Sequence, residues 1–446
     1  MISDATAWRL NSTDEMLHQA AARLGSSRIV QILWRFPTPL AADALQAEWD
    51  QLNQGLLSRR ATGARIPVAR RKWLTADNAE PLHLERRSLT EATAPDWIDT
   101  QVRAPLPADS RALWRLAAAP YRGGCLVSLT VPHFRSDGLG IVNAIAARHA
   151  PRHRGDGVPD SDLADALRQL ARTVPQVARW GIRLLGDRQE RTALTNAVRR
   201  HPDPHTASGS TPQFFTSAIY EVDARRWQEQ AQAHGGTVNS LFVEVAANLI
   251  RERVPRAANA TIDVGIPMSL RHPTHDERAN ALVVVPLTVP GGTPRHGDLR
   301  ATRQATKALL QSSGRHSTTR VPEPLWHLLP ARYAEPLKNP GAQQVDVVAS
   351  NFGVAPDELA ILAGRKADSI ALRTMNVPGL VPERARLRAS LCLLRTGDQL
   401  TVTVTGMPAP YGDNASLHSL VTDEFTAWGL TARPWWNAPA PDMKKG

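Results

Sequence analysis

Hydrophobic residues follow two different spacings, which alternate along the chain. Continuous or every-second-residue apolar runs predict β-strands, at residues 28–35, 113–116, 125–131, 214–222, 262–267, 281–289, 344–349, 389–394 and 399–405. Apolar positions three and four residues apart predict helices, at residues 14–24, 41–52, 139–147, 162–185 and 237–250. The pattern therefore predicts an α/β protein (α+β, with mixed sheets covered by helices).

This mixture of strands and helices occurs on both sides of a stretch with a different composition. Residues 151–213 have Gly, Pro and Asp at both ends and a helical middle. A chain of 446 residues also exceeds the size of a single ordinary core. We therefore expect an N-terminal lobe at 1–150, a connecting helical segment at 151–213 and a C-terminal lobe at 214–446.

The predicted helix at 162–185 is amphipathic, with arginines on one face. Its other face carries the apolar residues Leu163, Leu167, Leu170, Val174, Val177 and Trp180. Such a helix either connects the lobes or lies on a membrane surface. Pro175 interrupts the pattern, and a packed crossover tolerates this interruption, so we favour the connector. Peripheral membrane contact is the alternative.

The net charge of +11 comes almost entirely from arginines that are scattered along the chain. No zinc finger, heptad-linked basic region or aromatic RNA-binding signature accompanies them, so we expect no nucleic-acid partner. A basic surface instead suits the phosphates of acyl-CoA, an acidic carrier protein or anionic lipid headgroups. The charge by itself does not choose among these three partners.

The positions of cysteine and histidine argue against disulfide and metal sites. The only cysteines, Cys125 and Cys392, lie inside apolar runs. Histidines at 201 and 205 and at 272 and 275 have ligand-like spacing but lie in proline-containing loops without further ligands.

No charged-then-apolar leader opens the chain and no apolar run reaches membrane length, so we expect a cytoplasmic protein. We also expect a monomer that binds no metal.

One stretch, residues 125–147, joins a strand, a histidine and a helix. The strand ends just before His133, and Asp137-Gly138 turns the chain into the next helix. A histidine at a rigid strand end is suited to take a proton from an alcohol, amine or thiol. We expect Asp137 to cap the helix or to form a buried ion pair, and Gly138 to allow close approach of backbone or ligand. The alternative is an ordinary turn beside a buried histidine.

Four motifs resemble those of the CoA-dependent acyltransferase superfamily, which holds chloramphenicol acetyltransferase, peptide-synthetase condensation domains and wax ester synthase/diacylglycerol acyltransferases. Residues 132–138, Pro-His-Phe-Arg-Ser-Asp-Gly, are similar to the family's His-His-x-x-x-Asp-Gly. Residues 237–239 and 265–271 are similar to the start of a buried helix and to the Pro-Val-Ser-Leu-Arg strand of the wax-synthase branch. Residues 349–353, Ala-Ser-Asn-Phe-Gly, stand in the place of its Ser-Asn-Val-Pro-Gly. The four motifs occur in the family's order.

The resemblance implies two chloramphenicol-acetyltransferase-like lobes with a central tunnel between them. It implies that His133, Asp137 and Gly138 form the catalytic motif, with His133 as the base. It also implies that Arg271 pairs with Asp137 and so holds the histidine loop in shape. The residues implied for the tunnel or the oxyanion are Ser350, Asn351 and Asn239.

The implied activity is transfer of an acyl group from a CoA or carrier-protein thioester to a small-molecule alcohol or amine. An ester or amide would form, in specialised metabolism. No bound cofactor is expected, because the acyl-CoA or phosphopantetheine-linked donor is itself a substrate. Attack by water or by an internal nucleophile would give a hydrolase or cyclase on the same fold.

The chain departs from the family's motifs at a few positions. Pro132 replaces the first histidine, which leaves a non-catalytic condensation-like module that recruits a carrier protein as a further alternative. Ser240 stands where the wax-synthase branch carries aspartate, and Phe352-Gly353-Val354 replaces its Val-Pro-Gly.

Overall fold

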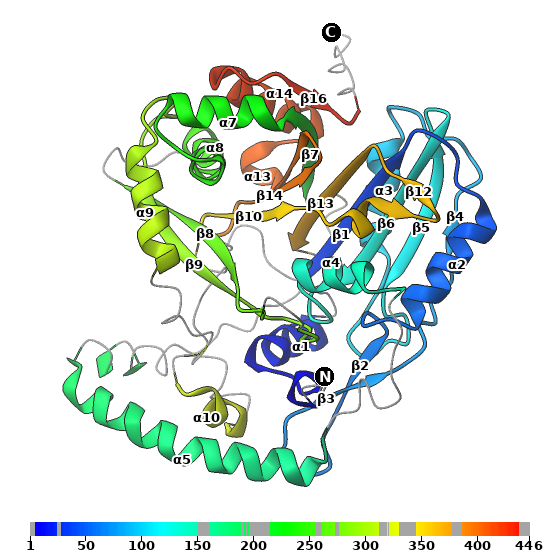
Figure 1. Cartoon of the computed structure of the whole chain (residues 1–446). Helices are drawn as coiled ribbons and strands as arrows, with labels where there is room; N and C mark the ends of the chain where they lie inside the picture. The colour runs from blue at the N-terminus through cyan, green and yellow to red at the C-terminus, as the bar shows by residue number, and fades with distance from the viewer. Residues whose placement is uncertain are drawn as a thin grey trace.

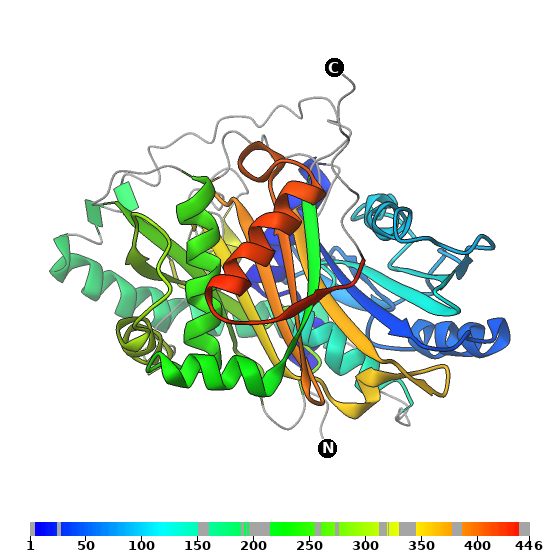
Figure 2. The ribbon, with the colours of Figure 1, turned by 90° about the horizontal axis from the view of Figure 1, so that it is seen from above.

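The computed structural model describes residues 5–24, 28–149, 160–188, 191–192, 194–195, 215–254, 260–272, 276–311, 319, 321–329, 345–376 and 386–436. In this part of the chain two large β-sheets are covered by helices (Figure 1). Figure 2 shows the strands running through the middle, with α7 and α8 in green on one side and α2 in blue on the other. Parallel and antiparallel pairs occur in both sheets, so the predicted mixed-sheet α/β class is confirmed.

The first sheet has the strand order β13-β1-β6-β5-β4. Its strands are β1 (Arg28–Phe36), β4 (His83–Leu84), β5 (Arg115–Tyr121), β6 (Gly124–Pro132) and β13 (Ser369–Asn376). One face packs against α2 (Ala42–Asn53) and α4 (Gly138–Ala146), and the other packs against α3 (Ala94–Arg103). β5 and β6, which include the apolar runs predicted as strands at 113–116 and 125–131, form a hairpin that turns at Arg122 and Gly123 with left-handed φ angles of 51° and 76°.

The second sheet has the order β16-β7-β15-β14-β10-β8-β9. Its strands are β7 (Thr216–Asp223), β8 (Thr261–Ser269), β9 (Leu282–Pro290), β10 (Val347–Val354), β14 (Ala389–Thr396), β15 (Gln399–Gly406) and β16 (Ala432–Pro434). Its helices are α7 (Ala224–Ala233), α8 (Val238–Arg253), α9 (Arg300–Gln311) and α14 (Asn414–Ala427). Helix α8 begins at a capping box of Thr237 and Ser240, and every residue from Ser240 to Arg251 is buried, as its apolar pattern predicts.

Strand β13 joins the two sheets and is not predicted from the sequence. It lies in the range predicted for the C-terminal lobe, 214–446, but pairs antiparallel with β1 of the first sheet. From the second sheet, the Thr403 hydroxyl donates to the Leu372 carbonyl of β13 at 2.6 Å. The apolar alternation of β13 is interrupted by Arg373, whose side chain is buried, so the usual strand signal is weak.

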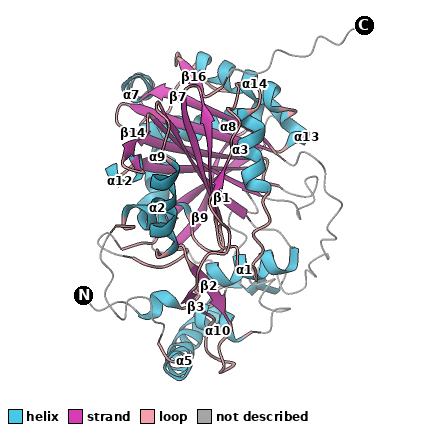
Figure 3. Ribbon diagram, turned by 90° about the vertical axis from the view of Figure 1, so that its right-hand side faces the viewer, coloured by secondary structure: helices cyan, strands magenta, loops and turns pink. Residues whose placement is uncertain are grey.

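The smaller elements include a group at the lower end of the molecule in Figures 1 and 3. This group consists of α1 (Ser12–Leu24), β2 (Arg59–Thr62), β3 (Lys72–Thr75), α5 (Asp162–Gly186) and α10 (Glu323–Leu328). The others are η1 (Ala5–Trp8), α12 (Asp357–Ala360), β11 (Ile361–Leu362), β12 (Arg365–Lys366) and α13 (Pro408–Tyr411). Helix α5 continues through Pro175. Among the described helices, none is long and apolar enough to cross a membrane.

Candidate active site

Strand β6 carries His133 at its C-terminal end. Every residue of β6 is buried, up to and including Pro132, so the loop that follows starts from a rigid base. The backbone N–H of His133 donates to the carbonyl of Arg28 on β1 at 2.7 Å. Pro132, at the position of the family's first histidine, is thus part of the strand, and His133 lines the cavity described below.

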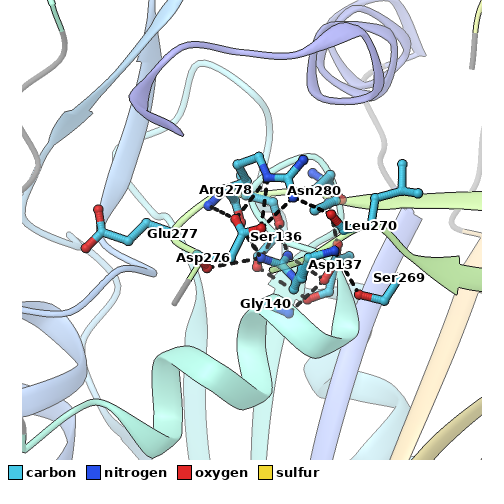
Figure 4. Close-up of polar contacts among 12 residues, drawn as sticks. Ser136, Asp137, Gly140, Ser269, Leu270, Asp276, Glu277, Arg278 and Asn280 are labelled. Carbon is cyan, nitrogen blue, oxygen red and sulfur yellow. Dashed lines mark hydrogen bonds and ion pairs between the residues drawn. The ribbon is translucent and has the colours of Figure 1, made fainter. Parts of the chain in front are cut away.

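Asp137 caps a helix and also forms a buried ion pair, the two arrangements that the sequence left open. Its Oδ1 accepts the backbone N–H of Gly140 at 2.7 Å, which caps α4. The same oxygen accepts a hydrogen bond from Nη2 of Arg271 at 2.8 Å. Its Oδ2 accepts the backbone N–H of Ala281 at 2.7 Å. Figure 4 shows Asp137 enclosed by these contacts, with Asn280 beside it.

Arg271, which follows β8, is held by backbone carbonyls as well as by Asp137. Its Nη1 donates to the carbonyl of Arg278 at 2.8 Å, and its Nη2 donates to that of Ala279 at 3.0 Å. Gly140 is needed here, because a Cβ at this position would lie 2.6 Å from Nη2 of Arg271 and 2.3 Å from Oγ of Ser136. The guanidinium therefore ties the loop after β8 of the second sheet to the histidine loop of the first.

Gly138 packs against the ring of Phe352 on β10. A Cβ at Gly138 would lie 2.3 Å from Cε1 and 2.7 Å from Cζ of that ring, far inside van der Waals contact. Gly138 therefore lets β10 approach the start of α4. Phe352 is one of the positions where this chain differs from the wax-synthase branch. The residue that differs therefore packs directly against the glycine of the histidine motif.

Asn280 places a buried amide beside His133, and no motif or periodicity of the sequence marks this residue. Its Nδ2 donates to Oδ1 of Asp14 at 2.8 Å and to the carbonyl of Phe134 at 3.4 Å. Its Oδ1 and the Nδ1 of His133 are both buried, and neither has a hydrogen-bond partner among the described residues. The Asn280 amide oxygen is thus available to accept a proton carried on Nδ1, which leaves Nε2 for a substrate.

The surroundings of His133 favour its neutral form. Burial lowers the pKa of His133 below its usual range, the charge of Asp137 opposes this shift, and the charge of Arg28 adds to it. A neutral imidazole is the form that can take up a proton. On the far side of Asn280, burial raises the pKa of the Asp14 carboxyl to about 7, and its hydrogen bonds with Asn280 oppose the shift.

The three polar residues implied for the tunnel or the oxyanion lie in one region. Ser350 and Asn351 of β10 line the cavity, whereas Asn239 of α8 does not. Nδ2 of Asn351 donates to Oδ1 of Asn239 at 3.3 Å, and Oδ1 of Asn351 accepts the backbone N–H of Gly353 at 2.9 Å. The Asn351 side chain thus connects β10 to α8, and its contact with an oxyanion stays a prediction.

A cavity of about 120 Å³ is lined by residues from both sheets. Arg28, His133, Asp137 and Gly138 form part of its wall. Its apolar lining consists of Leu139, Pro267, Met268, Ala281, Leu282, Val284, Val348, Phe352, Met375 and Leu387. Its other polar lining residues are Ser269, Ser350, Asn351, Thr374 and Ser390. The cavity holds the predicted base, whereas the implied tunnel stays a prediction.

Neither cysteine lines the cavity. Cys125 and Cys392 are buried and free, and burial raises the pKa of each thiol to about 11, so both are protonated at neutral pH. Of the paired histidines, those at 201, 205 and 275 lie outside the described residues. Within the described ranges, no three His, Cys, Asp or Glu side chains gather as metal ligands.

The chain matches no protein-family model and no curated protein sequence, but solved structures resemble it along most of its length. The first condensation domain of the CDA synthetase has a TM-score of 0.56 and 18% identity, covering 94% of this chain and 95% of that one. The wax ester synthase/diacylglycerol acyltransferase from Marinobacter aquaeolei VT8 has a TM-score of 0.51 and 14% identity, covering 94% and 100%. The starter condensation domain of rhizomide synthetase, in complex with C8-CoA and Leu-SNAC, has a TM-score of 0.50 and 14% identity, covering 95% and 94%.

At these identities the likeness concerns the fold. The chain has the two-lobed fold of condensation domains and of the wax ester synthase, which is the fold of the CoA-dependent acyltransferase superfamily that its motifs resemble.

Proposed function

We propose that this protein is a condensation-like acyltransferase, which moves an acyl group from a CoA or carrier-protein thioester to an alcohol or amine. The observation that carries the proposal is His133, a buried imidazole in a cavity wall, on a loop that Asp137 and Arg271 hold in place. Burial lowers the pKa of His133, which favours the neutral form. The shared fold supports the same class of reaction. The product would be an ester or amide of specialised metabolism, made in the cytoplasm.

In the proposed reaction, Nε2 of His133 takes the proton of the acceptor hydroxyl or amine. The acceptor's lone pair forms a bond to the thioester carbonyl carbon, and the carbonyl π electrons move onto its oxygen. When this tetrahedral state collapses, the carbon–sulfur bond breaks and the imidazolium returns the proton to the departing thiolate. We assign Oδ1 of Asn280 as the acceptor for Nδ1–H during the reaction, because both atoms are buried and neither has another partner among the described residues. This bond would orient the ring and stabilise the imidazolium.

The rest of the cavity suits an uncharged acyl group near its thioester carbon. Its lining is mainly apolar, and Ser350 supplies a hydroxyl on the β10 wall. We assign the oxyanion contact to Ser350 before Asn351, because the Asn351 amide donates to Asn239. A volume of about 120 Å³ is below the ~300–1,000 Å³ of common ligand pockets, so the cavity would hold the reacting groups rather than a whole donor.

The test is thiol release from a panel of acyl-CoA and acyl-carrier-protein donors, each offered with an alcohol and with an amine. His133→Ala should lower the release rate by about 10²–10⁴-fold, the usual contribution of a general base. His83→Ala, at an exposed histidine of the edge strand β4, is the matched control and should keep the full rate. Equal rates in wild type and His133→Ala would refute the catalytic role.

Mass spectrometry of the products separates the remaining alternatives. An ester or amide of the added acceptor supports transfer, whereas a free acid or a cyclic product would assign the site to hydrolysis or cyclisation. If wild type binds a carrier protein but releases no thiol from any donor, the protein is a recruiting module instead.

A further inference from the structure

Helix α5 turns most of its apolar face away from the protein, whereas Trp180 at one edge of that face packs against the cluster that contains Trp326. Six of its aliphatic side chains are between 46% and 79% exposed, namely Leu163, Leu167, Leu170, Val174, Ile182 and Leu185. The residues of α5 that are buried are Asp165, Ala166 and Gln169. A surface helix normally buries its apolar stripe, so the orientation of α5 is the reverse of the usual one.

Ion pairs explain why the polar side of α5 faces inward. Asp162 pairs with Arg9 at 2.9 Å and with Lys72 at 3.0 Å. Asp165, one turn further on, pairs with Arg70 at 2.7 Å and accepts the Arg70 backbone N–H at 2.8 Å. Both carboxylates are tied to the region of β3, so the leucines on the opposite side of the helix must point outward.

The exposed part of α5 is cationic as well as apolar. Between Ala166 and Gly186 the helix has four arginines and no acidic residue. Arg172, Arg179 and Arg183 are exposed, and at 100° per residue they form a row on the polar side of the helix, with Ile182 as the nearest residue of the apolar stripe. Arginine side chains are long enough to extend around the helix toward lipid phosphates while the apolar side chains enter the acyl region.

We propose that α5 lies flat on an anionic lipid bilayer, with its apolar stripe in the membrane and its arginine row on the headgroups. Figures 1 and 3 show α5 at the lower end of the molecule, opposite α7 and α14, where a flat surface can approach it. A second copy of α5 is a poorer partner, because residues 166–186 offer no carboxylate to pair with the arginines of the other copy. A bilayer with anionic lipids supplies both the apolar and the anionic component.

Vesicle flotation of the full chain tests the proposal. We expect the protein to float with vesicles of phosphatidylcholine containing about one-third phosphatidylglycerol, and much less with phosphatidylcholine alone. Val174→Asp combined with Ile182→Asp should weaken binding at least about tenfold, because two charges enter the apolar stripe. The matched control is Leu310→Asp, at an exposed leucine of α9, which should bind as wild type does.

A second variant tests the arginine row. Arg172→Gln, Arg179→Gln and Arg183→Gln together should also weaken binding and reduce its dependence on salt. All substituted positions are exposed, so melting temperatures and thiol release from short, water-soluble donors should match wild type, which separates this test from that of the proposed function. Failure of wild type to float, or undiminished flotation of the Val174/Ile182 variant, overturns the proposal. A dimer in sedimentation that the same variant abolishes, without flotation, would assign the face to a second copy instead.

Discussion

Two buried Asp–Arg pairs of this molecule have nearly the same geometry and different surroundings. Asp137 and Arg271 meet at 2.8 Å beside His133, and Asp99 and Arg373 meet at 2.7 Å between α3 and β13. In both pairs Nη2 of the arginine donates to Oδ1 of the aspartate, and both side chains are almost completely buried.

The difference lies in what else each pair contacts. Asp137 accepts two further hydrogen bonds from backbone N–H groups, and Arg271 donates to backbone carbonyls, so this pair shapes loops. Arg373 instead donates to the side chains of Gln31 at 2.6 Å and Ser217 at 2.8 Å, which lie on strands of different sheets. The same ion-pair chemistry therefore fixes a loop in one place and joins regular elements in the other.

The largest effect is expected from Arg271→Met. This change leaves the Asp137 carboxylate buried without its cation and frees the loop after β8. The free energy of unfolding should fall by about 3–5 kcal/mol, measured by urea denaturation, and thiol release should be lost. Exchanging the two charges, Asp137→Arg with Arg271→Asp, should not restore either property, because arginine cannot accept the N–H groups of Gly140 and Ala281. Recovery in the exchanged variant would show that charge alone holds the loop.

Arg373→Met should lower stability by a similar amount, about 3–5 kcal/mol, because Asp99 is then buried without a partner. The rate of thiol release per folded molecule should stay within about twofold of wild type, since the pair does not contact the histidine loop. Urea denaturation gives the folded fraction of each variant. The thiol-release assay is then run under conditions in which that variant is folded. A loss of rate as large as that of Arg271→Met would remove the distinction between the two pairs.

Gly138→Ala tests whether the histidine loop depends on packing as well as on the ion pair. The new methyl group would overlap the Phe352 ring, and overpacking of this kind costs about 1–3 kcal/mol. Phe352→Leu in the same chain should recover part of that loss, and a double-mutant cycle in urea measures the coupling. Gly63→Ala is the control, since a Cβ there meets no atom within 4 Å. If Gly138→Ala lowers the free energy of unfolding by the same amount with and without Phe352→Leu, the contact between the two residues is unimportant.

The smallest effect is expected in the pH dependence of thiol release. Because burial and Arg28 lower the pKa of His133, its neutral form should persist below pH 6.5, and so should the activity. Arg28→Met removes a cation and should move the acid limb to higher pH. Asp137→Asn removes an anion and should move it to lower pH, in the fraction that stays folded. Asp99→Asn should leave it unchanged, and shifts of the same sign in the Arg28 and Asp137 variants would contradict the electrostatic account.

The same depressed pKa affects stability. The unfolded chain binds a proton on His133 more strongly than the folded chain does. Protonation of this group therefore leaves the free energy of unfolding unchanged well above pH 6.5 and lowers it progressively as the pH falls below 6.5.

Much of the fold follows from patterns that are local in the sequence. The hairpin of β5 and β6 is predicted by two apolar runs and the glycines between them, and α8 by its cap and its apolar faces. His133, Asp137 and Gly138 are found because they lie in one short stretch, and Arg271 is found from the resemblance to a family motif. Asn280 is not found, since its position beside His133 depends on the loop between Arg271 and β9.

The sequence by itself determined the two element types, the mixed-sheet class and the candidate base, because periodicity, turn residues and strand ends act over a few residues. Only the tertiary structure decided which partners meet across the sheets: β13 with β1, Phe352 with Gly138, and Asn280 with His133. It also decided the orientation of α5, for which the sequence favoured a packed connector and left an exposed apolar face as the alternative. Ion pairs between residues far apart in the chain made that choice, and no local pattern encodes them.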